Sequence, residues 1–173
     1  MGSIFDPVCV TLAMTGIDSV FHTATLHKPH VVTLSKQQFI DTNITGTNVL
    51  LQEAVKQRVD RFVFTSTTSV FGKAMQPGKD TPAVWVTEQL NPIPKNIYGA
   101  KKLAAEALRS LVHHEHGLNC LILRTSRFFP EDDDSATVRL DFTSDNSKAN
   151  EFLFRRVELE DVLSAHLLAA SRA

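Results

Sequence analysis

The chain has 173 residues, of which 43% are hydrophobic and 21% are charged, and its formal net charge at pH 7 is -1. This length and composition fit one compact domain of mixed secondary structure. No cluster of Lys and Arg gives the positive surface that nucleic acid or an anionic membrane requires, so we exclude both partners. No apolar run approaches the roughly 18 residues of a membrane span, and no secretory signal opens the chain, so we expect a soluble cytoplasmic protein.

Glycine-rich phosphate-binding turns are absent from these 173 residues. Only seven glycines occur and no three of them lie close together, so neither a GxGxxG turn nor a P-loop is present. Such turns bring backbone N–H groups and a helix N-terminus to a phosphate. Any binding of a nucleotide by these residues must therefore depend on other contacts.

The first part of the chain predicts helix, strand, helix and strand in turn. A helix over residues 6–16 begins with Asp6 as its N-cap, followed by a proline at the first helical position. Residues 18–24 predict a strand, and residues 35–57 predict a helix with apolar side chains at steps of three and four. Residues 61–67 form a β-branched and aromatic run, which is typical of a parallel strand buried on both faces.

The second part of the chain opens with a long loop. Residues 72–95 hold four prolines and two glycines, too many for regular structure, and loops of this length are usually functional. Residues 96–116 predict a helix and residues 118–124 another buried strand. A short strand over 155–159 and a helix from about residue 160 to the end complete the pattern.

The alternation of helices with continuous apolar strands predicts an α/β fold. We expect a doubly wound parallel sheet with right-handed crossovers, three main strands and flanking helices. The sequence has no internal repeat and no low-complexity linker, so residues 1–173 are expected to form one domain.

Tyr98 and Lys102 are the first candidates for chemistry. They lie four residues apart in a predicted helix, so both side chains project from one face. A lysine ammonium group beside a phenol favours the phenolate and lowers the phenol's pKa from about 10. Tyr98 could then exchange a proton with a substrate hydroxyl near neutral pH. Tyr98 is also the only tyrosine, and it opens a helix directly after the long loop.

A run of five hydroxyl side chains, residues 65–69, ends the predicted strand. Ligands of open parallel sheets bind beyond the carboxyl ends of the strands. A hydroxyl there could donate to a reacting carbonyl oxygen close to Tyr98. The alternative is that these Thr and Ser side chains only satisfy backbone groups of the turn.

No metal site is predicted. His113, His114 and His116 stand in the last turn of a helix, where histidines complement the helix dipole and are usually solvated. The acidic run at residues 131–134 is interpreted as a solvated loop surface.

Several ordered motifs resemble the extended short-chain dehydrogenase/reductase superfamily, in its NAD-dependent epimerase/dehydratase branch, over about residues 20–166. VFHTA at 20–24 is similar to the family's VFHxAA, DTNITGTN at 41–48 to DxNVxGTxN, TSTTSVFG at 65–72 to SSSxxVYG, and YGAKK at 98–102 to YxxxK. RTSRF at 124–128 and VELEDV at 157–162 are similar to two further family segments. The resemblance implies a partial NAD(P)-binding Rossmann-like domain, with the start of a substrate lobe near the C-terminus.

The resemblance also implies roles for individual residues. Tyr98 would be the catalytic acid/base, Lys102 its pKa-lowering partner and a ribose ligand, and Thr67 the hydroxyl that steadies the substrate oxygen. Aligning the family's VYG motif with residues 70–72 selects Thr67 from the hydroxyl run. The residues implied to contact the cofactor are His22, Ala24, Asn43, Thr65, Tyr98 and Lys102.

By the same resemblance, the activity would be that of an NAD- or NADP-dependent oxidoreductase or epimerase. Its substrate would be a small molecule with a hydroxyl or keto group, such as a nucleotide sugar. Helices 35–57 and 96–116 are elements through which family members commonly dimerise, so a homodimer is implied.

The chain departs from the family pattern at its start. The family's opening strand, glycine-rich turn and next segments have no counterpart in this sequence, and Ser3 stands where the family often has an acid. The strand at 19–24 would then have one unpaired edge. Two functions stay open: an NAD(P)-dependent enzyme, or a truncated, non-catalytic remnant that acts as an oligomerising or interaction module.

Overall fold

The computed structural model describes residues 2–27, 30, 33–129, 144, 146, 149 and 156–172. Its centre is a three-stranded parallel sheet in the order β1-β2-β3, formed by β1 (Ser19–His22), β2 (Arg61–Thr67) and β3 (Asn119–Thr125). The strands β4 (Arg127–Phe129) and β5 (Arg156–Glu158) pair in parallel as a second, smaller sheet. The α/β class and the three main parallel strands predicted from the sequence are confirmed.

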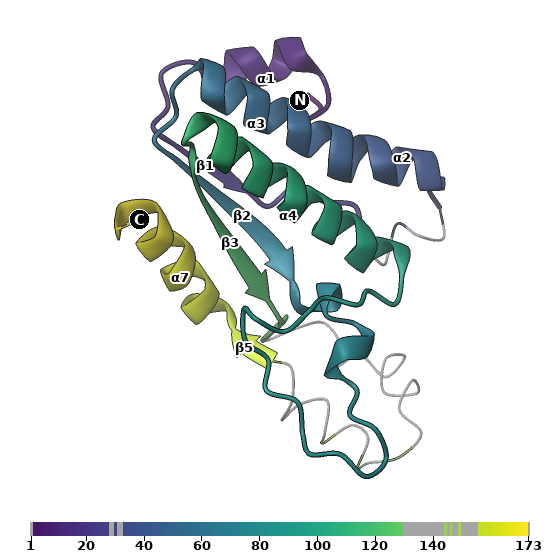
Figure 1. Cartoon of the computed structure of the whole chain (residues 1–173). Coiled ribbons are helices and arrows are strands. Elements are labelled where there is room, and N and C mark those ends of the chain that lie inside the picture. Colours follow the sequence, from purple (N-terminus) through teal and green to yellow (C-terminus); the bar gives the residue numbers. More distant parts are fainter. Residues whose placement is uncertain are drawn as a thin grey trace.

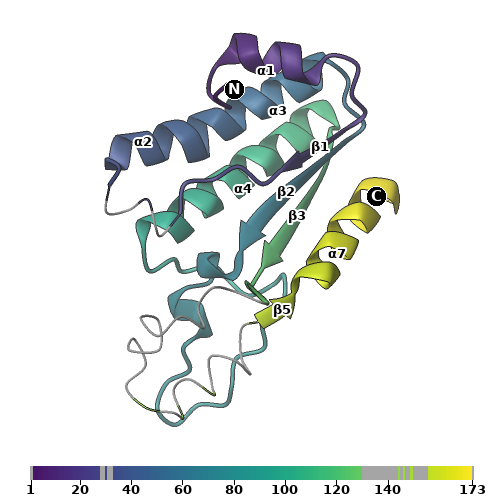
Figure 2. The same cartoon turned by 180° about the vertical axis from the view of Figure 1, so that it is seen from behind.

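Helices cover the sheet on both faces. On one face, α3 (Gly46–Lys56) and α4 (Ile97–His116) lie side by side, and α1 (Pro7–Met14) packs against α3 (Figure 1). The C-terminal helix α7 (Leu159–Arg172) packs against β2 and β3 (Figure 2). Neighbouring residues of a strand point to opposite faces, and Ser66 contacts α4 whereas Thr65 contacts α7. The two helices therefore lie on opposite faces of the sheet.

The helix predicted over 35–57 has a π turn in its middle. It begins as α2 (Lys36–Ile40), widens at Asp41–Thr45 and continues as α3. A π turn inserts a residue into the helix and so changes which side chains face inward. In this chain Asn43 and Thr47 are both buried, and no local sequence signal marks the insertion.

Capping residues define the helix ends, and the predicted N-cap Asp6 is one of them. Asp6 accepts the backbone N–H of Val8 at 3.0 Å at the start of α1, and Asn96 accepts that of Gly99 at 2.9 Å at the start of α4. Gly117 ends α4 with a φ of 70°, the left-handed conformation that glycine adopts without strain. These caps fix where α4 begins, and with it the position of Tyr98.

The core lies between the sheet and the α1, α3 and α4 layer. The side chains of Phe62 and Phe64 from β2 and Leu51 from α3 are among the largest that are fully buried. Residues 131–134 lie outside the described residues, as does position 155 of the last predicted strand. Among the helices that the structure describes, none is both long and apolar enough to cross a membrane.

Leu51→Ala is expected to lower the free energy of unfolding by about 2–5 kcal/mol, because it leaves a cavity in the packed core. Leu12→Ala is the matched control, since Leu12 is 74% exposed whereas Leu51 is 0% exposed. The control should change stability by no more than about 0.5 kcal/mol. Urea unfolding measures both variants, and equal losses would contradict this placement of the core.

Candidate functional site

Thr67 and Tyr98 meet at the carboxyl end of β2. Thr67 Oγ1 donates to Ser69 Oγ at 3.2 Å and accepts the backbone N–H of Ser69 at 3.1 Å, and its hydroxyl also lowers the pKa of Tyr98, which stands in the first turn of α4. Gly99 allows this approach, because a Cβ at that position would lie 2.5 Å from the carbonyl oxygen of Ser69. The helix start therefore packs directly on the turn that follows β2, and the structure brings together two of the three residues predicted to be catalytic.

Lys102 is buried one turn further along α4. Its Nζ donates a hydrogen bond to the carbonyl oxygen of Thr65 at 2.7 Å and lies 4.6 Å from the ring centroid of Phe64. Burial lowers the pKa of the Lys102 ammonium group to about 8, and the negative charge of Glu106 opposes this shift. An ammonium group has three N–H donors, so two are left for other acceptors.

The pKa of Tyr98 differs from the sequence expectation. Burial raises the pKa of the phenol, and the hydrogen bond with Thr67 opposes that rise. The Lys102 ammonium, which was expected to favour the phenolate, is held on the backbone of β2 in this arrangement. The phenol is therefore protonated at neutral pH and can donate its proton.

Thr65 links the two faces of the sheet. Its carbonyl accepts from Lys102, and its Oγ1 lies 2.7 Å from Nε2 of His166 on α7. His166 Nδ1 lies 2.7 Å from the carbonyl oxygen of Val162, which can only accept, so Nδ1 carries a proton. In the neutral ring, Nε2 then accepts the hydroxyl proton of Thr65. No local pattern in the sequence marks His166 as a partner of Thr65, because the two residues lie 101 positions apart.

His22 is buried at the end of β1 on the face of α3. Its Nε2 lies 2.9 Å from the hydroxyl of Thr47, which itself donates to the carbonyl oxygen of Asn43 at 2.9 Å. The hydroxyl proton is thus used, so Nε2 of His22 is the donor. Burial, and secondarily the charge of Lys102, lower the pKa of His22 to about 3, so its ring is neutral at physiological pH.

Asn43 holds the loop that follows β1. Its Oδ1 accepts the backbone N–H of Leu26 at 2.8 Å, and its Nδ2 donates to the carbonyl oxygen of the same residue at 2.9 Å. Ala24 is exposed in this loop. The structure therefore gives Asn43 a bracing role, and contact of Asn43, Ala24, His22 or Thr65 with a cofactor stays a prediction.

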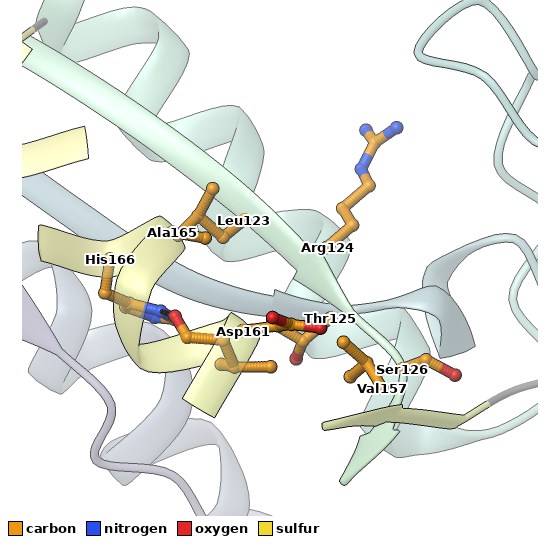
Figure 3. Close-up of a pocket in the computed structure, with 9 residues that line it drawn as sticks. Leu123, Arg124, Thr125, Ser126, Val157, Asp161, Ala165 and His166 are labelled. Atoms are coloured by element: carbon orange, nitrogen blue, oxygen red, sulfur yellow. Dashed lines mark hydrogen bonds between the residues drawn. The ribbon is translucent and has the colours of Figure 1, made fainter. Parts of the chain in front are cut away.

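A cavity of about 330 Å³ lies between the end of β3 and α7, and Figure 3 shows its lining. Its polar side chains are those of Thr125 and Ser126 on one side and of Asp161 and His166 on the other, whereas the side chain of Arg124 points away from it (Figure 3). Thr67, Tyr98 and Lys102 are not part of this lining. Within the described residues, no group of three or more His, Cys, Asp or Glu side chains is placed to hold a metal ion.

Residues 2–150 match the family model described as NAD dependent epimerase/dehydratase family. The chain belongs to the NAD-dependent epimerase/dehydratase family, and the family predicted from the motifs is confirmed.

Known relatives include an uncharacterized protein, y4nG, from Sinorhizobium fredii, which is 35% identical over 125 residues, covering 71% of this chain and 28% of that protein. A dTDP-glucose 4,6-dehydratase from Streptomyces niveus is 32% identical over 130 residues, covering 75% of this chain and 37% of the relative. This chain thus spans about a third of the length of these relatives.

The fold is similar to that of solved family structures. UDP-glucuronic acid 4-epimerase from Bacillus cereus, in complex with UDP-glucuronic acid and NAD, aligns with a TM-score of 0.74 at 24% identity. That alignment covers 98% of this chain and 54% of the epimerase. At this identity the similarity establishes the Rossmann-like fold.

Thr67→Val is expected to raise the pKa of Tyr98, because it removes the hydrogen bond that opposes the effect of burial. Tyr98 is the only tyrosine, so the near-ultraviolet absorbance of the phenolate reports its titration directly. Thr15→Val, an exposed site at the end of α1, is the control and should leave the midpoint unchanged. An unchanged midpoint in Thr67→Val would show that the two side chains do not interact.

Proposed function

We propose that this chain carries the reacting end of an NAD(P)-dependent oxidoreductase or epimerase site. The observation that carries the proposal is the close packing of the first turn of α4, with Tyr98, on the hydroxyl-rich turn at the carboxyl end of β2, with the buried Lys102 one turn away. The substrate class we propose is a nucleotide sugar, reacting at a hydroxyl or keto group. The names of relatives such as dTDP-glucose 4,6-dehydratase and UDP-glucose 4-epimerase support that class.

In this function, Tyr98 moves the proton at the substrate oxygen. Thr67 lies beside the phenol and orients the same oxygen by a hydrogen bond. Lys102 keeps one of its N–H groups on Thr65 and offers its other N–H donors to the bound cofactor, one helical turn from the phenol. General acid–base catalysis of this kind contributes about 10²–10⁴-fold to a rate.

The residues present fit the nicotinamide and ribose end of the cofactor. Lys102 has two N–H donors beyond its bond to Thr65, which suit ribose hydroxyls. When bound, NAD or NADP would accept a hydride from the substrate carbon that bears the reacting oxygen. No glycine-rich turn for the pyrophosphate occurs in the sequence, so we assign only Lys102 and Tyr98, with the loop after β1, to this role.

Isothermal titration of the folded chain with NAD and with NADP tests the proposal. We expect saturable binding with a Kd below about 1 mM, worth about 4 kcal/mol. Lys102→Met should weaken binding, whereas Lys79→Met, at an exposed lysine of the long loop, should not.

Tyr98→Phe should keep cofactor binding and lower turnover of a nucleotide sugar by about 10²–10⁴-fold. A folded chain that binds neither cofactor would favour the non-catalytic interaction module instead.

The pH dependence of turnover tests the role of Lys102. Because burial lowers its pKa to about 8, the fraction of charged Lys102 falls as the pH rises through 8. We therefore expect kcat/KM, which reports groups of the free enzyme, to decline above about pH 8. An arginine stays charged over this range, so the activity that remains in Lys102→Arg should lose the decline. The same decline in Lys102→Arg would assign it to another group.

We also propose that the chain forms a homodimer through the outer surface of α2, α3 and α4. Ile40 on α2, and Ile97 and Leu111 on α4, are exposed apolar side chains. Leu111→Glu should yield a monomer in analytical ultracentrifugation, because it places a charge in the apolar interface. Leu167→Glu is the control, since Leu167 is even more exposed, at 64% against 50% for Leu111, but lies on α7 across the sheet. Loss of the dimer in both variants would place the interface elsewhere.

A further inference from the structure

Glu106 is buried on α4, one turn beyond Lys102, and is only 3% exposed. Ser66 Oγ donates to its Oε1 at 2.5 Å. The guanidinium of Arg124 donates from Nε to Oε1 at 3.1 Å and from Nη2 to Oε2 at 2.8 Å. A buried carboxylate is stable only with partners of this kind, and loss of one partner leaves the other charge exposed to an apolar interior.

The partners of Glu106 come from two neighbouring strands. Ser66 of β2 and Arg124 of β3 are paired in register, so their side chains lie next to each other on the face that α4 covers. The Arg124 guanidinium also lies 4.9 Å from the ring centroid of Phe71, in the segment that follows β2. The Glu106 carboxylate thus joins α4 to β2 and to β3. Through Arg124 it is also linked to Phe71, in the segment that follows the hydroxyl run.

The segment of β2 that Glu106 holds is also the one that carries the candidate site. Ser66 stands between Thr65, whose carbonyl accepts from Lys102, and Thr67, which begins the turn that the first turn of α4 packs against. On α4, positions 98, 102 and 106 recur every four residues and share one face. Three consecutive residues of the strand therefore meet three consecutive turns of the helix, and a slip of α4 along the sheet would disturb all three contacts.

We propose that Glu106 is a positioning residue for the Thr67 and Tyr98 pair. Its ion pair with Arg124 and its hydrogen bond with Ser66 hold α4 at the height along β2 where Tyr98 reaches Thr67. This role rests on the proposed function, in which that pair handles the substrate oxygen. Glu106 itself lies two turns from Tyr98, about 12 Å along the helix axis, and acts through the helix.

Titration of Tyr98 by its phenolate absorbance tests this role without any substrate. Glu106→Gln keeps the size of the side chain and removes its charge, so the Arg124 ion pair is lost and α4 is free to shift. We expect the Tyr98 midpoint to rise, because the hydrogen bond from Thr67 that lowers it is weakened. Glu53→Gln is the matched control: Glu53 is 9% exposed and bonded to Lys56 and Gln57 on α3, away from the site.

The direction of the shift separates positioning from electrostatics. Removing the Glu106 carboxylate and leaving the Arg124 charge would by itself stabilise the phenolate and lower the midpoint. A rise therefore reports the lost contact. In a Thr67→Val background, where that contact is already absent, Glu106→Gln should give no further rise, so the two substitutions should be non-additive.

Ser66→Ala is the second variant, for the case that Glu106→Gln does not fold. It removes only the hydroxyl that joins β2 to Glu106, and a smaller rise of the Tyr98 midpoint is expected. A midpoint that is unchanged or lower in every folded variant would overturn the role and leave Glu106 a structural ion-pair partner. A raised midpoint in a chain that binds neither NAD nor NADP would support the positioning role and reject the proposed function.

Discussion

A buried ammonium group needs an acceptor, and this need determines how the helix that carries the candidate site meets the sheet. Lys102 finds its acceptor in the carbonyl oxygen of Thr65, a backbone atom whose position is fixed by the ladders of β2 with β1 and β3. With Lys102 held there, the first turn of α4 stands over the end of β2, where the hydroxyl run begins to turn. The neighbouring Glu106 also raises the pKa of Lys102 against the effect of burial, so the same carboxylate that anchors the helix helps to keep its lysine charged.

Two histidines show how the same side chain is given opposite proton positions by its surroundings. His22 carries its proton on Nε2, because the hydroxyl of Thr47 is already donating elsewhere. His166 carries its proton on Nδ1, because a carbonyl oxygen lies against that atom. His22 thus ties the end of β1 to α3 on one face of the sheet, and His166 ties the end of β2 to α7 on the other face. The backbone pairing of β1 and β2 is parallel in both cases. Their ends therefore differ in the polar side chains that they carry.

Local signals in the sequence predicted most of the fold. Asp6 was predicted as the N-cap of the first helix, and the apolar run of β2 matched its observed bounds of Arg61–Thr67. The π turn at Asp41–Thr45 was not predictable, because its sequence continues the helical pattern and only the packing of Asn43 against Leu26 accounts for it. The spacing of Tyr98 and Lys102 predicted that they share one face of the helix. It did not predict that Lys102 donates to the carbonyl oxygen of Thr65. That contact joins residues 37 apart in the sequence, and no periodicity reports it.

The contact of Gly99 with the carbonyl oxygen of Ser69 has a consequence for motion. Because no side chain separates the helix from the turn, the spacing of the two backbones at this point is set by van der Waals contact between main-chain atoms. Main-chain positions fluctuate less than side-chain rotamers do, which change within nanoseconds at exposed positions. The contact therefore limits how closely the first turn of α4 can approach the turn after β2, and so the height at which Tyr98 stands above the strand end. An arrangement of this kind lowers the entropic cost of bringing a reacting oxygen to its proton donor.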